Sequence, residues 1–413
     1  MNFPAAETYL LSLGNEVEAM KLGLENIRKL LAALGNPETN YLKVQVAGTN
    51  GKGSVCAFLD SICREAGIEV GVFTSPHLVS ITERVRINGT DIADEEFARI
   101  ATVVRETSEK LVSTGELETV PTYFEQVTAN ALVAFAEAKV KLAILETGMG
   151  GRYDATTAAN AEIAAITRID MDHQEYLGET LSEIAAEKAA IIRPDSQVAV
   201  CDQSRIAMKI ILSRCAEVGV SPRLTTEFLG QGFGLPALGL SGTHQTENAE
   251  VAILLAYTLR DYFKIPDEAV TAGLENARHP GRLEYQGRYL FDGAHNIGGA
   301  KALGKYLDEF ETRPVTLIFG ATVNKGAGKM MEILFPRAEL VICTRSRNSR
   351  SLHLRDLLEE IPRHVGERMM WFIGTCDEAL AKAHEITPEN GLILVSGSLY
   401  LVGEAKRILR SQI

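Results

Sequence analysis

A short apolar run, a glycine-rich loop and a helix-patterned segment follow one another without a break near the start of the chain. The run is Val44–Ala47, the loop is Gly48-Thr-Asn-Gly-Lys-Gly-Ser54, and the helical pattern continues to Cys63. Glycines let backbone N–H groups turn toward an anion, and a helix that begins there directs the positive end of its dipole to the same place. Lys52 supplies a charge for terminal phosphates and Ser54 a hydroxyl that can bind Mg²⁺. The order predicts a phosphate-binding loop.

A tight strand-to-helix turn is the simpler interpretation, because glycine-rich turns are common. The loop also has a glycine between its lysine and its hydroxyl residue, which departs from the common P-loop spacing. We favour phosphate binding because the strand, glycines, lysine, hydroxyl and helix occur in the expected order. The expected nucleotide contacts are six loop residues: Thr49, Asn50, Gly51, Lys52, Gly53 and Ser54.

Composition and charge narrow the class of protein. The chain has 413 residues, 46% of them hydrophobic and 23% charged, as in globular proteins, and this length favours two domains. Its 42 basic and 54 acidic residues give a net charge of −12, which argues against nucleic acid as a partner. No window approaches about 18 uninterrupted apolar residues, so we expect no membrane partner. The N-terminus lacks the basic start and apolar core of a signal peptide.

The six cysteines contain no CxxC pair. Cys56 and Cys63 lie seven residues apart in a helical pattern, which is typical of core packing. We therefore expect a cytoplasmic, reduced protein without structural disulfides or zinc, and we expect it to be a monomer.

Short apolar runs alternate with helix-patterned segments along the first half of the chain. The expected strands are Lys43–Ala47, Glu69–Thr74, Leu142–Glu146, Glu162–Thr167 and Gln197–Cys201. The expected helices are Ser54–Ala66, Asp94–Ser113, Phe124–Ala138 and Leu181–Ile192. This alternation predicts an α/β domain with a mainly parallel sheet and helices on both faces, and ligands of such sheets bind at the carboxyl ends of the strands.

A second strand–helix series begins near Tyr289. Its expected strands are Tyr289–Phe291, Val315–Gly320, Glu339–Thr344, Met370–Ile373 and Leu392–Ser396. The Pro-Gly pair at 280–281 and its polar flanks suit a hinge, so we place the boundary near residue 280, between domains 1–280 and 281–413. Residues 222–242 are rich in Gly, Leu and Pro and predict a small irregular or β-rich appendage.

Two further motifs place polar residues at the carboxyl ends of expected strands. Glu146 ends a strand and precedes a glycine-rich loop, where a carboxylate can bind Mg²⁺. A solvent-exposed acid at a strand end is the alternative. Asp172 and His173 follow the next strand of the expected sheet. An isolated histidine is more often structural than a ligand, so both interpretations stay open.

Lys188 interrupts a nearly apolar helical stripe. A lysine that extends its amine to water is the simpler interpretation. Burial, however, disfavours a charged amine, and the neutral amine can react with CO₂ to give a carbamate, an anion able to bind a metal. Lys188 is therefore a candidate for a carbamylated metal ligand.

Eight motifs occur together in the order found in one enzyme family. They are GTNGKGS, TSPHL (74–78), ERVRING (83–89), ETGMGGRYDAT (146–156), DH followed by LGETLSEIAAEKAAIIRP, GTHQTENA (242–249), HPGRLE (279–284) and DGAHN (292–296). Over roughly residues 40–300 the sequence resembles the folylpolyglutamate synthase/dihydrofolate synthase family of the Mur ligase superfamily. The resemblance implies an N-terminal P-loop-type Mur ligase ATPase domain and a smaller C-terminal Rossmann-like α/β glutamate ligase domain.

The resemblance implies an ATP-dependent carboxylate–amine ligase. In such enzymes a carboxylate attacks the γ-phosphate of ATP to give an acyl phosphate, and the amino group of L-glutamate then displaces phosphate. Two Mg²⁺ sites are implied. By matching positions, Ser54, Ser75 and Glu146 serve the first site, and His173 with carbamylated Lys188 serves the second.

The resemblance also implies roles for residues further along the chain. Asn248, Arg282 and Asp292 match nucleotide contacts, and His295 lies close to the reacting groups by analogy. With Lys52, His173 and Lys188, His295 completes the expected catalytic set. Closure of two domains over the cleft would keep water from the acyl phosphate.

The expected substrates are folate or dihydropteroate and L-glutamate. Pro121–Glu125 resembles the region that contacts pteroate in dual-function relatives, which favours a bifunctional enzyme. A Mur-type ligase of cell-wall precursors is an alternative, but TSPHL and ERVRING argue against it. A nucleotide-binding switch without ligase chemistry is another, and the retained Glu146, His173 and Lys188 argue against that.

Overall fold

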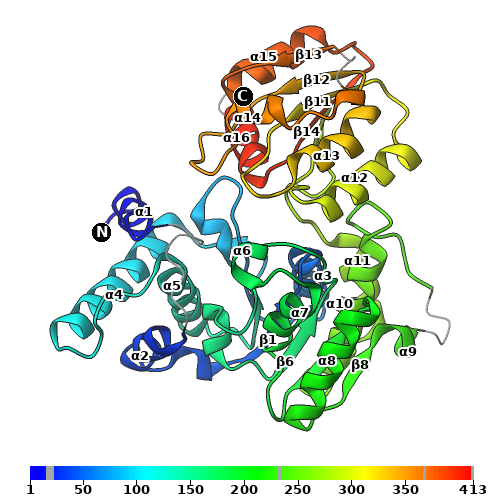
Figure 1. The fold of residues 1–413 in the computed structure, drawn as a ribbon. Helices are drawn as coiled ribbons and strands as arrows, with labels where there is room; N and C mark the ends of the chain where they lie inside the picture. The colour runs from blue at the N-terminus through cyan, green and yellow to red at the C-terminus, as the bar shows by residue number, and fades with distance from the viewer. Residues whose placement is uncertain (15–22, 230–233, 366–368, 411–413) are drawn as a thin grey trace. The chain divides into compact units, whose positions relative to one another are not determined.

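The computed structural model describes residues 1–14, 23–229, 234–365 and 369–410. Backbone contacts divide the chain into two compact units, which Figure 1 shows. Unit 1 comprises Met1–Gly239 and Glu247–Ala277, and unit 2 comprises Leu240–Thr246 and Arg278–Ile413. Each unit contains its own largely parallel sheet with helices, so the predicted α/β class is confirmed. The domain limits 1–280 and 281–413 stay a prediction.

Unit 1 is built on an eight-stranded sheet of order β4-β3-β2-β5-β1-β6-β7-β8. Its strands are β1 (Leu42–Ala47), β2 (Val70–Phe73), β3 (Val85–Ile87), β4 (Thr90–Asp91), β5 (Leu142–Glu146), β6 (Ile163–Ile166), β7 (Gln197–Val200) and β8 (Pro222–Leu224). In this spatial order, the six strands β2-β5-β1-β6-β7-β8 are parallel to one another. Strand β3 pairs antiparallel with both β2 and β4. All five residues of β5 are buried, as in a central strand that is covered on both faces.

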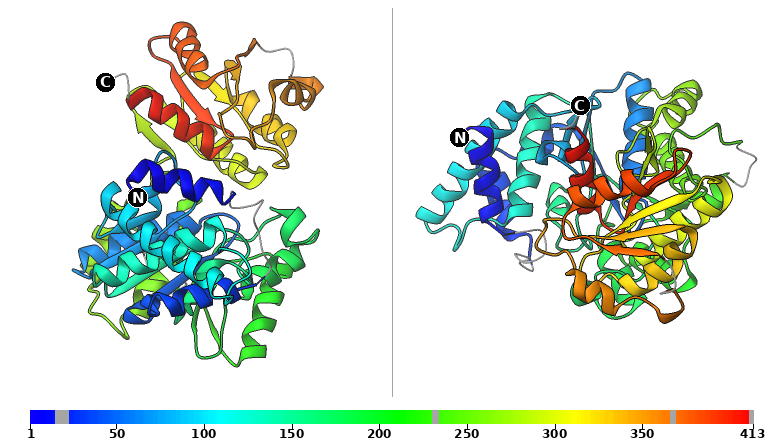
Figure 2. Two further views of the ribbon diagram at one scale, coloured as in Figure 1. Left: turned by 90° about the vertical axis from the view of Figure 1, so that its left-hand side faces the viewer. Right: turned by 90° about the horizontal axis from the view of Figure 1, so that it is seen from above.

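Helices cover both faces of this sheet (Figures 1 and 2). Helix α3 (Lys52–Glu65) packs against β1, β2 and β5, and α11 (Asp267–Asn276) packs against α3. Helix α5 (Tyr123–Glu137) packs against β2 and β3. The remaining helices are α1 (Phe3–Ser12), α2 (Glu25–Ala33), α4 (Asp94–Ser113), α6 (Gln174–Leu177), α7 (Leu181–Ala189), α8 (Arg205–Val218), α9 (Thr225–Leu229) and α10 (Gln245–Leu259), which enters unit 1 at Glu247.

Capping residues explain where two of these helices begin. Thr122 caps α5 and Thr180 caps α7, and in each case a glutamate three residues later bonds back to the cap. Such a capping box satisfies backbone N–H groups that the helix itself leaves without acceptors. The structure ends α7 at Ala189, three residues before the predicted end at Ile192.

Unit 2 contains a six-stranded sheet of order β13-β12-β11-β14-β10-β9, in which only the edge strand β9 is antiparallel among the described residues. The strands are β9 (Glu284–Gln286), β10 (Tyr289–Phe291), β11 (Val315–Phe319), β12 (Leu340–Cys343), β13 (Met370–Phe372) and β14 (Leu392–Ser396). The helices are α12 (Ile297–Phe310), α13 (Ala327–Leu334), α14 (Leu354–Glu359), α15 (Cys376–Ile386) and α16 (Leu399–Arg410).

The prediction of an appendage at 222–242 is wrong for its first residues. Pro222–Leu224 form β8, which joins the edge of the main sheet beside β7. Proline has no N–H to donate, and an edge strand tolerates it. Residues 230–233 lie outside the described residues, and Leu240–Thr246 belong to unit 2. Within the described ranges, no helix has the length and apolar composition to cross a membrane.

Candidate active site

The predicted phosphate loop, Gly48–Ser54, connects β1 to α3. Helix α3 begins at Lys52, and Gly51 precedes it with φ of 90°, a left-handed conformation that favours glycine. The N–H groups in the first turn of a helix have no acceptor within that helix. The amides of Lys52, Gly53 and Ser54 therefore suit an anion, and the positive end of the helix dipole favours it further.

Residues of the segment that follows β6 bind Thr49 and Asn50, which lie in the first part of the phosphate loop. The amides of Thr49 and Asn50 both donate to the Arg168 carbonyl, at 2.8 and 3.2 Å. The Thr49 hydroxyl donates to the Asp170 carbonyl at 3.0 Å, and the Asn50 amide side chain donates to the Asp170 carboxylate at 3.3 Å. In this conformation, the amides of Thr49 and Asn50 bind the protein itself.

Two glycines in the loop allow close approach of other side chains. A Cβ at Gly48 would lie 1.8 Å from the Thr167 hydroxyl oxygen, and a Cβ at Gly51 would lie 2.1 Å from Asn248 Oδ1. Asn248 comes from α10, so the structure places this predicted nucleotide contact directly against the phosphate loop. The glycines are needed here for space as well as for backbone conformation.

Two predicted lysines meet at one backbone oxygen. Lys52 Nζ donates to the Gly48 carbonyl at 3.0 Å and to the Thr49 carbonyl at 3.3 Å. Lys188 Nζ, from α7, donates to the same Gly48 carbonyl at 2.9 Å. Lys188 is 4% exposed, so it is not the solvent-reaching lysine of the simpler interpretation. Both amines lie at the phosphate loop.

Glu146 and Ser75 also lie together. Glu146 ends β5 opposite Val46 of β1, it is 6% exposed, and its carboxylate accepts the Ser75 amide at 3.2 Å. A buried carboxylate next to a serine offers the oxygen ligands that Mg²⁺ prefers, with phosphate oxygens and water completing such sites. Among the described residues no three His, Cys, Asp or Glu side chains gather as a metal site, so a metal here would need these other oxygens.

His173 directly precedes the short helix α6, as its N-cap residue, with φ of 50°. Its backbone amide donates to Asp172 Oδ1 at 2.9 Å, and its Nε2 lies 3.7 Å from Asp172 Oδ2. A non-glycine residue in the left-handed region is uncommon and is found often at functional sites. Asp172 and His173 thus interact with each other in the segment that follows β6, and both interpretations of His173 stay open.

Unit 2 holds the remaining predicted residues in one turn and loop. The Asp292 carboxylate accepts the amides of Leu283 and Ala294, at 3.0 and 2.9 Å, and burial raises its pKa although Arg282 acts in the opposite direction. Arg282 Nη1 donates to the Gly293 carbonyl at 3.4 Å. His295 Nδ1 lies 2.8 Å from the same carbonyl. Arg282, Asp292 and His295 are thus neighbours within this unit.

Comparison with known proteins assigns the chain to a family. The Mur ligase middle domain matches residues 46–227, and the Mur ligase glutamate ligase domain matches residues 281–399. Dihydrofolate synthase/folylpolyglutamate synthase from Bacillus subtilis is 33% identical, over 95% of this chain and 96% of that protein. The chain belongs to the dihydrofolate synthase/folylpolyglutamate synthase family of Mur ligases.

Other members of the family differ in length or were crystallised with ligands. A probable bifunctional folylpolyglutamate synthase/dihydropteroate synthase from Haloferax volcanii is 34% identical over 94% of this chain, but the chain spans only about half of that protein's length, 48%. Folylpolyglutamate synthase from Mycobacterium tuberculosis, complexed with ADP, has a TM-score of 0.90, 27% identity and 98% coverage of both chains. A bifunctional synthase from Yersinia pestis, with AMPPNP and Mn, has a TM-score of 0.85, 27% identity and 99% and 98% coverage.

Several residues that shape this site are not among those predicted from the sequence. Thr167 and Asp170 hold the phosphate loop, yet only Asp172 and His173 were singled out in that motif. Their position directly after β6, which pairs with β1, was the available signal.

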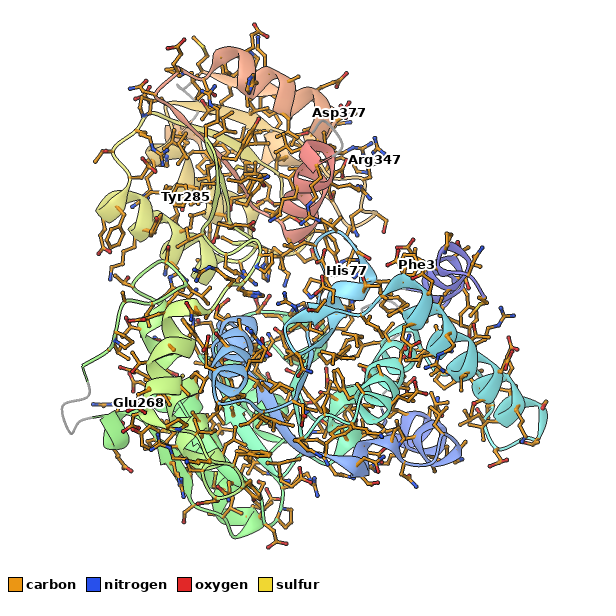
Figure 3. All side chains as sticks on the ribbon, turned by 180° about the vertical axis from the view of Figure 1, so that it is seen from behind. Phe3, His77, Glu268, Tyr285, Arg347 and Asp377 are labelled. Atoms are coloured by element: carbon orange, nitrogen blue, oxygen red, sulfur yellow. The ribbon has the colours of Figure 1, made fainter. Side chains whose placement is uncertain are left out.

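The loop after β2 contains a further polar cluster that was missed, in which Figure 3 labels His77. Arg84 Nε donates to His77 Nδ1 at 2.9 Å, and burial, then Arg84, lowers the pKa of His77 to about 3. The Glu83 carboxylate accepts three amides of the same loop, at 2.7, 3.0 and 3.1 Å. The spacing of Ser80 and Glu83 was a capping-box signal that could have found this loop anchor.

Proposed function

We propose that this chain uses ATP to join L-glutamate to a carboxylate of a folate through an acyl phosphate. The observation that carries the proposal is the convergence of Lys52, Lys188 and Asn248 on a loop at a helix N-terminus, with Glu146 at the end of a strand that neighbours β1. Family membership and the nucleotide-bound relatives support it. The chain spans about half the length of some curated relatives, so the activity of those proteins comes to this chain only as a proposal.

Phosphoryl transfer depends mostly on positioning and on neutralising charge. We propose that the amides of the first turn of α3 and the amine of Lys52 bind the phosphates of ATP. Lys52 would exchange its two carbonyl acceptors for phosphate oxygens, which are stronger acceptors because they are charged. Asn248, whose side chain lies next to Gly51, is proposed as a nucleotide contact. Thr49 and Asn50 would bind phosphate through their amides only after these amides leave Arg168.

Oxygen atoms of α3, of the loop after β2 and of the end of β5 fit a divalent cation, which we propose to be Mg²⁺. Ser54, Ser75 and Glu146 would hold it, and when bound it neutralises phosphate charge. We propose a second site at His173 and a carbamylated Lys188. The amine of Lys188 lies at the phosphate loop and is buried, so a carbamate there would replace a buried positive charge with an anion. Intact-protein mass spectrometry and ¹³C NMR after labelling with ¹³CO₂ would detect the modification.

Within unit 2, we propose that Arg282 and Asp292 contact the nucleotide and that His295 lies close to the reacting groups. The side chains of Arg282 and His295 both bind the Gly293 carbonyl, and Asp292 orders the backbone on either side of it. We also propose domain limits of 1–280 and 281–413, and a monomer.

The deciding experiment measures ADP release that depends on glutamate. We expect release with tetrahydrofolate, and also with dihydropteroate if the chain is bifunctional as we propose. Each folate substrate should be tested alone, with glutamate omitted as the control. ADP release that is indifferent to both glutamate and folate would support a nucleotide switch instead. Release only with a cell-wall precursor would support the Mur-type alternative.

A further inference from the structure

The turn that carries Arg282 has a strained backbone. Gly281 has φ of 71° and Leu283 has φ of 44°, so two of three consecutive residues lie in the left-handed region. Glycine adopts this conformation at little cost, whereas a leucine does not. Such strain persists only where the surrounding structure imposes it, and it is common at ligand-binding sites.

Two carboxylates impose this backbone from opposite ends of the turn. The Leu283 amide donates to Asp292 Oδ2 at 3.0 Å, and the Gly281 amide donates to Glu284 Oε2 at 2.7 Å. The Gly281 carbonyl accepts the Gly293 amide at 2.8 Å. Arg282 lies between these anchors, so its backbone position depends on both carboxylates.

Glu284 is itself held by a buried lysine of α16. Lys406 Nζ forms an ion pair with the Glu284 carboxylate, and the lysine is 4% exposed. The amine also lies 5.5 Å from the centre of the Phe291 ring, on the strand residue paired with Glu284. A charge buried to this extent needs its partner, so the pair fixes the Glu284 carboxylate. Figure 3 labels the next residue of β9, Tyr285.

We propose that Lys406 and Glu284 are positioning residues that hold Arg282 in the conformation in which it binds the nucleotide. The proposal rests on the proposed nucleotide contact of Arg282. Lys406 acts through Glu284, Glu284 acts through the Gly281 amide, and neither needs to touch the substrate. The Arg282 guanidinium itself donates to the Gly293 carbonyl. A purely structural ion pair would stabilise unit 2 without affecting nucleotide affinity.

Two double variants separate positioning from stability. Glu284→Met with Lys406→Met removes both charges and also the acceptor for the Gly281 amide. Glu284→Gln with Lys406→Met removes both charges but keeps a carbonyl acceptor at 284. Since a hydrogen bond to a charged group is worth about tenfold or more in an equilibrium constant, we expect the first variant to raise the ADP dissociation constant about tenfold. In the second variant the neutral amide at 284 keeps the acceptor and needs no cation beside it, so the ADP dissociation constant should stay within about threefold of the wild type.

Calorimetric titration with ADP gives the affinity, and steady-state kinetics should show the change in the ATP KM rather than in kcat. Thermal unfolding records stability separately. If both double variants bind ADP as the wild type does, the positioning role is overturned. If both weaken binding equally, the acceptor at 284 is not what matters, and the role is overturned as well.

Arg282→Ala distinguishes failure of this inference from failure of the proposed contact. If Arg282→Ala binds ADP normally, the proposed contact is wrong and the positioning role falls with it. If Arg282→Ala binds weakly while the Met/Met variant binds normally, only the positioning role is wrong.

Should the Met/Met variant not fold, Lys406→Gln serves in its place, with Arg407→Gln as the exposed control on the same helix. We expect weaker ADP binding from the first and unchanged binding from the second. Equal affinities would overturn the inference.

Discussion

Substitution of Gly51 by alanine tests the phosphate loop at its tightest point. Gly51 has φ of 90°, and an added Cβ would lie 2.1 Å from Asn248 Oδ1 and 3.1 Å from its Cγ. The Asn248 side chain must therefore rotate away. Because Asn248 is a proposed nucleotide contact, the substitution should weaken nucleotide binding without removing any charge.

Gly67 provides a matched control for the backbone. It has φ of 74°, but nothing lies within 4 Å of a Cβ added there. A left-handed non-glycine residue costs about 1–2 kcal/mol, so both substitutions should share that cost. In Gly51→Ala the Asn248 side-chain amide is also displaced, so the free energy of nucleotide binding should weaken by about 1 kcal/mol, the net value of a typical hydrogen bond. The difference between the two variants isolates the contact with Asn248.

Nucleotide affinity is the best assay, since a chain with two units need not unfold in one step. We expect Gly51→Ala to raise the ADP dissociation constant about fivefold, equivalent to about 1 kcal/mol, and Gly67→Ala to leave it within about twofold. Asn248→Ala should weaken binding by itself, and Gly51→Ala should then cost little more. Equal ADP affinities for the Gly51 and Gly67 variants would refute the assignment of Asn248 to the nucleotide.

Three further outcomes follow from the site. Lys52→Ala should lower kcat/KM for ATP at least about a hundredfold, as loss of a charge-stabilising donor does, with an unchanged circular dichroism spectrum; near-wild-type turnover would exclude Lys52 from the phosphates. Lys188→Ala should lose activity that bicarbonate does not restore, whereas a short carboxylic acid should restore part of it; full activity would exclude a metal-binding carbamate. Because the pKa of His77 falls from 6.5 to about 3 on folding, the unfolded chain takes up its proton first, and stability should decrease as the pH falls from 6.5 toward 3. Denaturant unfolding of His77→Gln should show a shallower decrease over that range, and an identical pH dependence would contradict the assignment.

The strands were predictable because their sequence signal is local. Every strand expected in the two series is present, with ends that differ by at most one residue. Central parallel strands such as β5 and β14 are apolar up to their last residue, and polar residues follow directly, so their limits are clear in the sequence. The short strands β3, β4, β8 and β9 were not predicted, because strands of two or three residues carry little periodicity.

The orientation of the phosphate loop could not be predicted from its glycines. The sequence indicates where amides can turn toward an anion, but not what they bind in the absence of one. Thr49 and Asn50 donate to Arg168, a residue more than a hundred positions away in the chain, and this depends on the pairing of β1 with β6. The turn at Gly281–Leu283 is similar, because its two carboxylate anchors are Asp292 and Glu284, and Glu284 is paired with the distant Lys406 of α16.

The order of the strands explains how these separate motifs come to lie at one edge of the sheet in unit 1. Strands β2, β5, β1 and β6 are consecutive neighbours and all run parallel, so their carboxyl ends meet at one edge of the sheet. At or just beyond these ends lie Ser75, Glu146, the phosphate loop and Asp172–His173, in the order of the strands. In the sequence the phosphate loop comes first, but in the sheet it lies between the predicted metal ligands. Lys188 reaches the Gly48 carbonyl from α7, which begins after the last of these segments. A parallel sheet can thus place acids and a histidine on both sides of a phosphate loop while each motif remains a short segment at the end of its own strand.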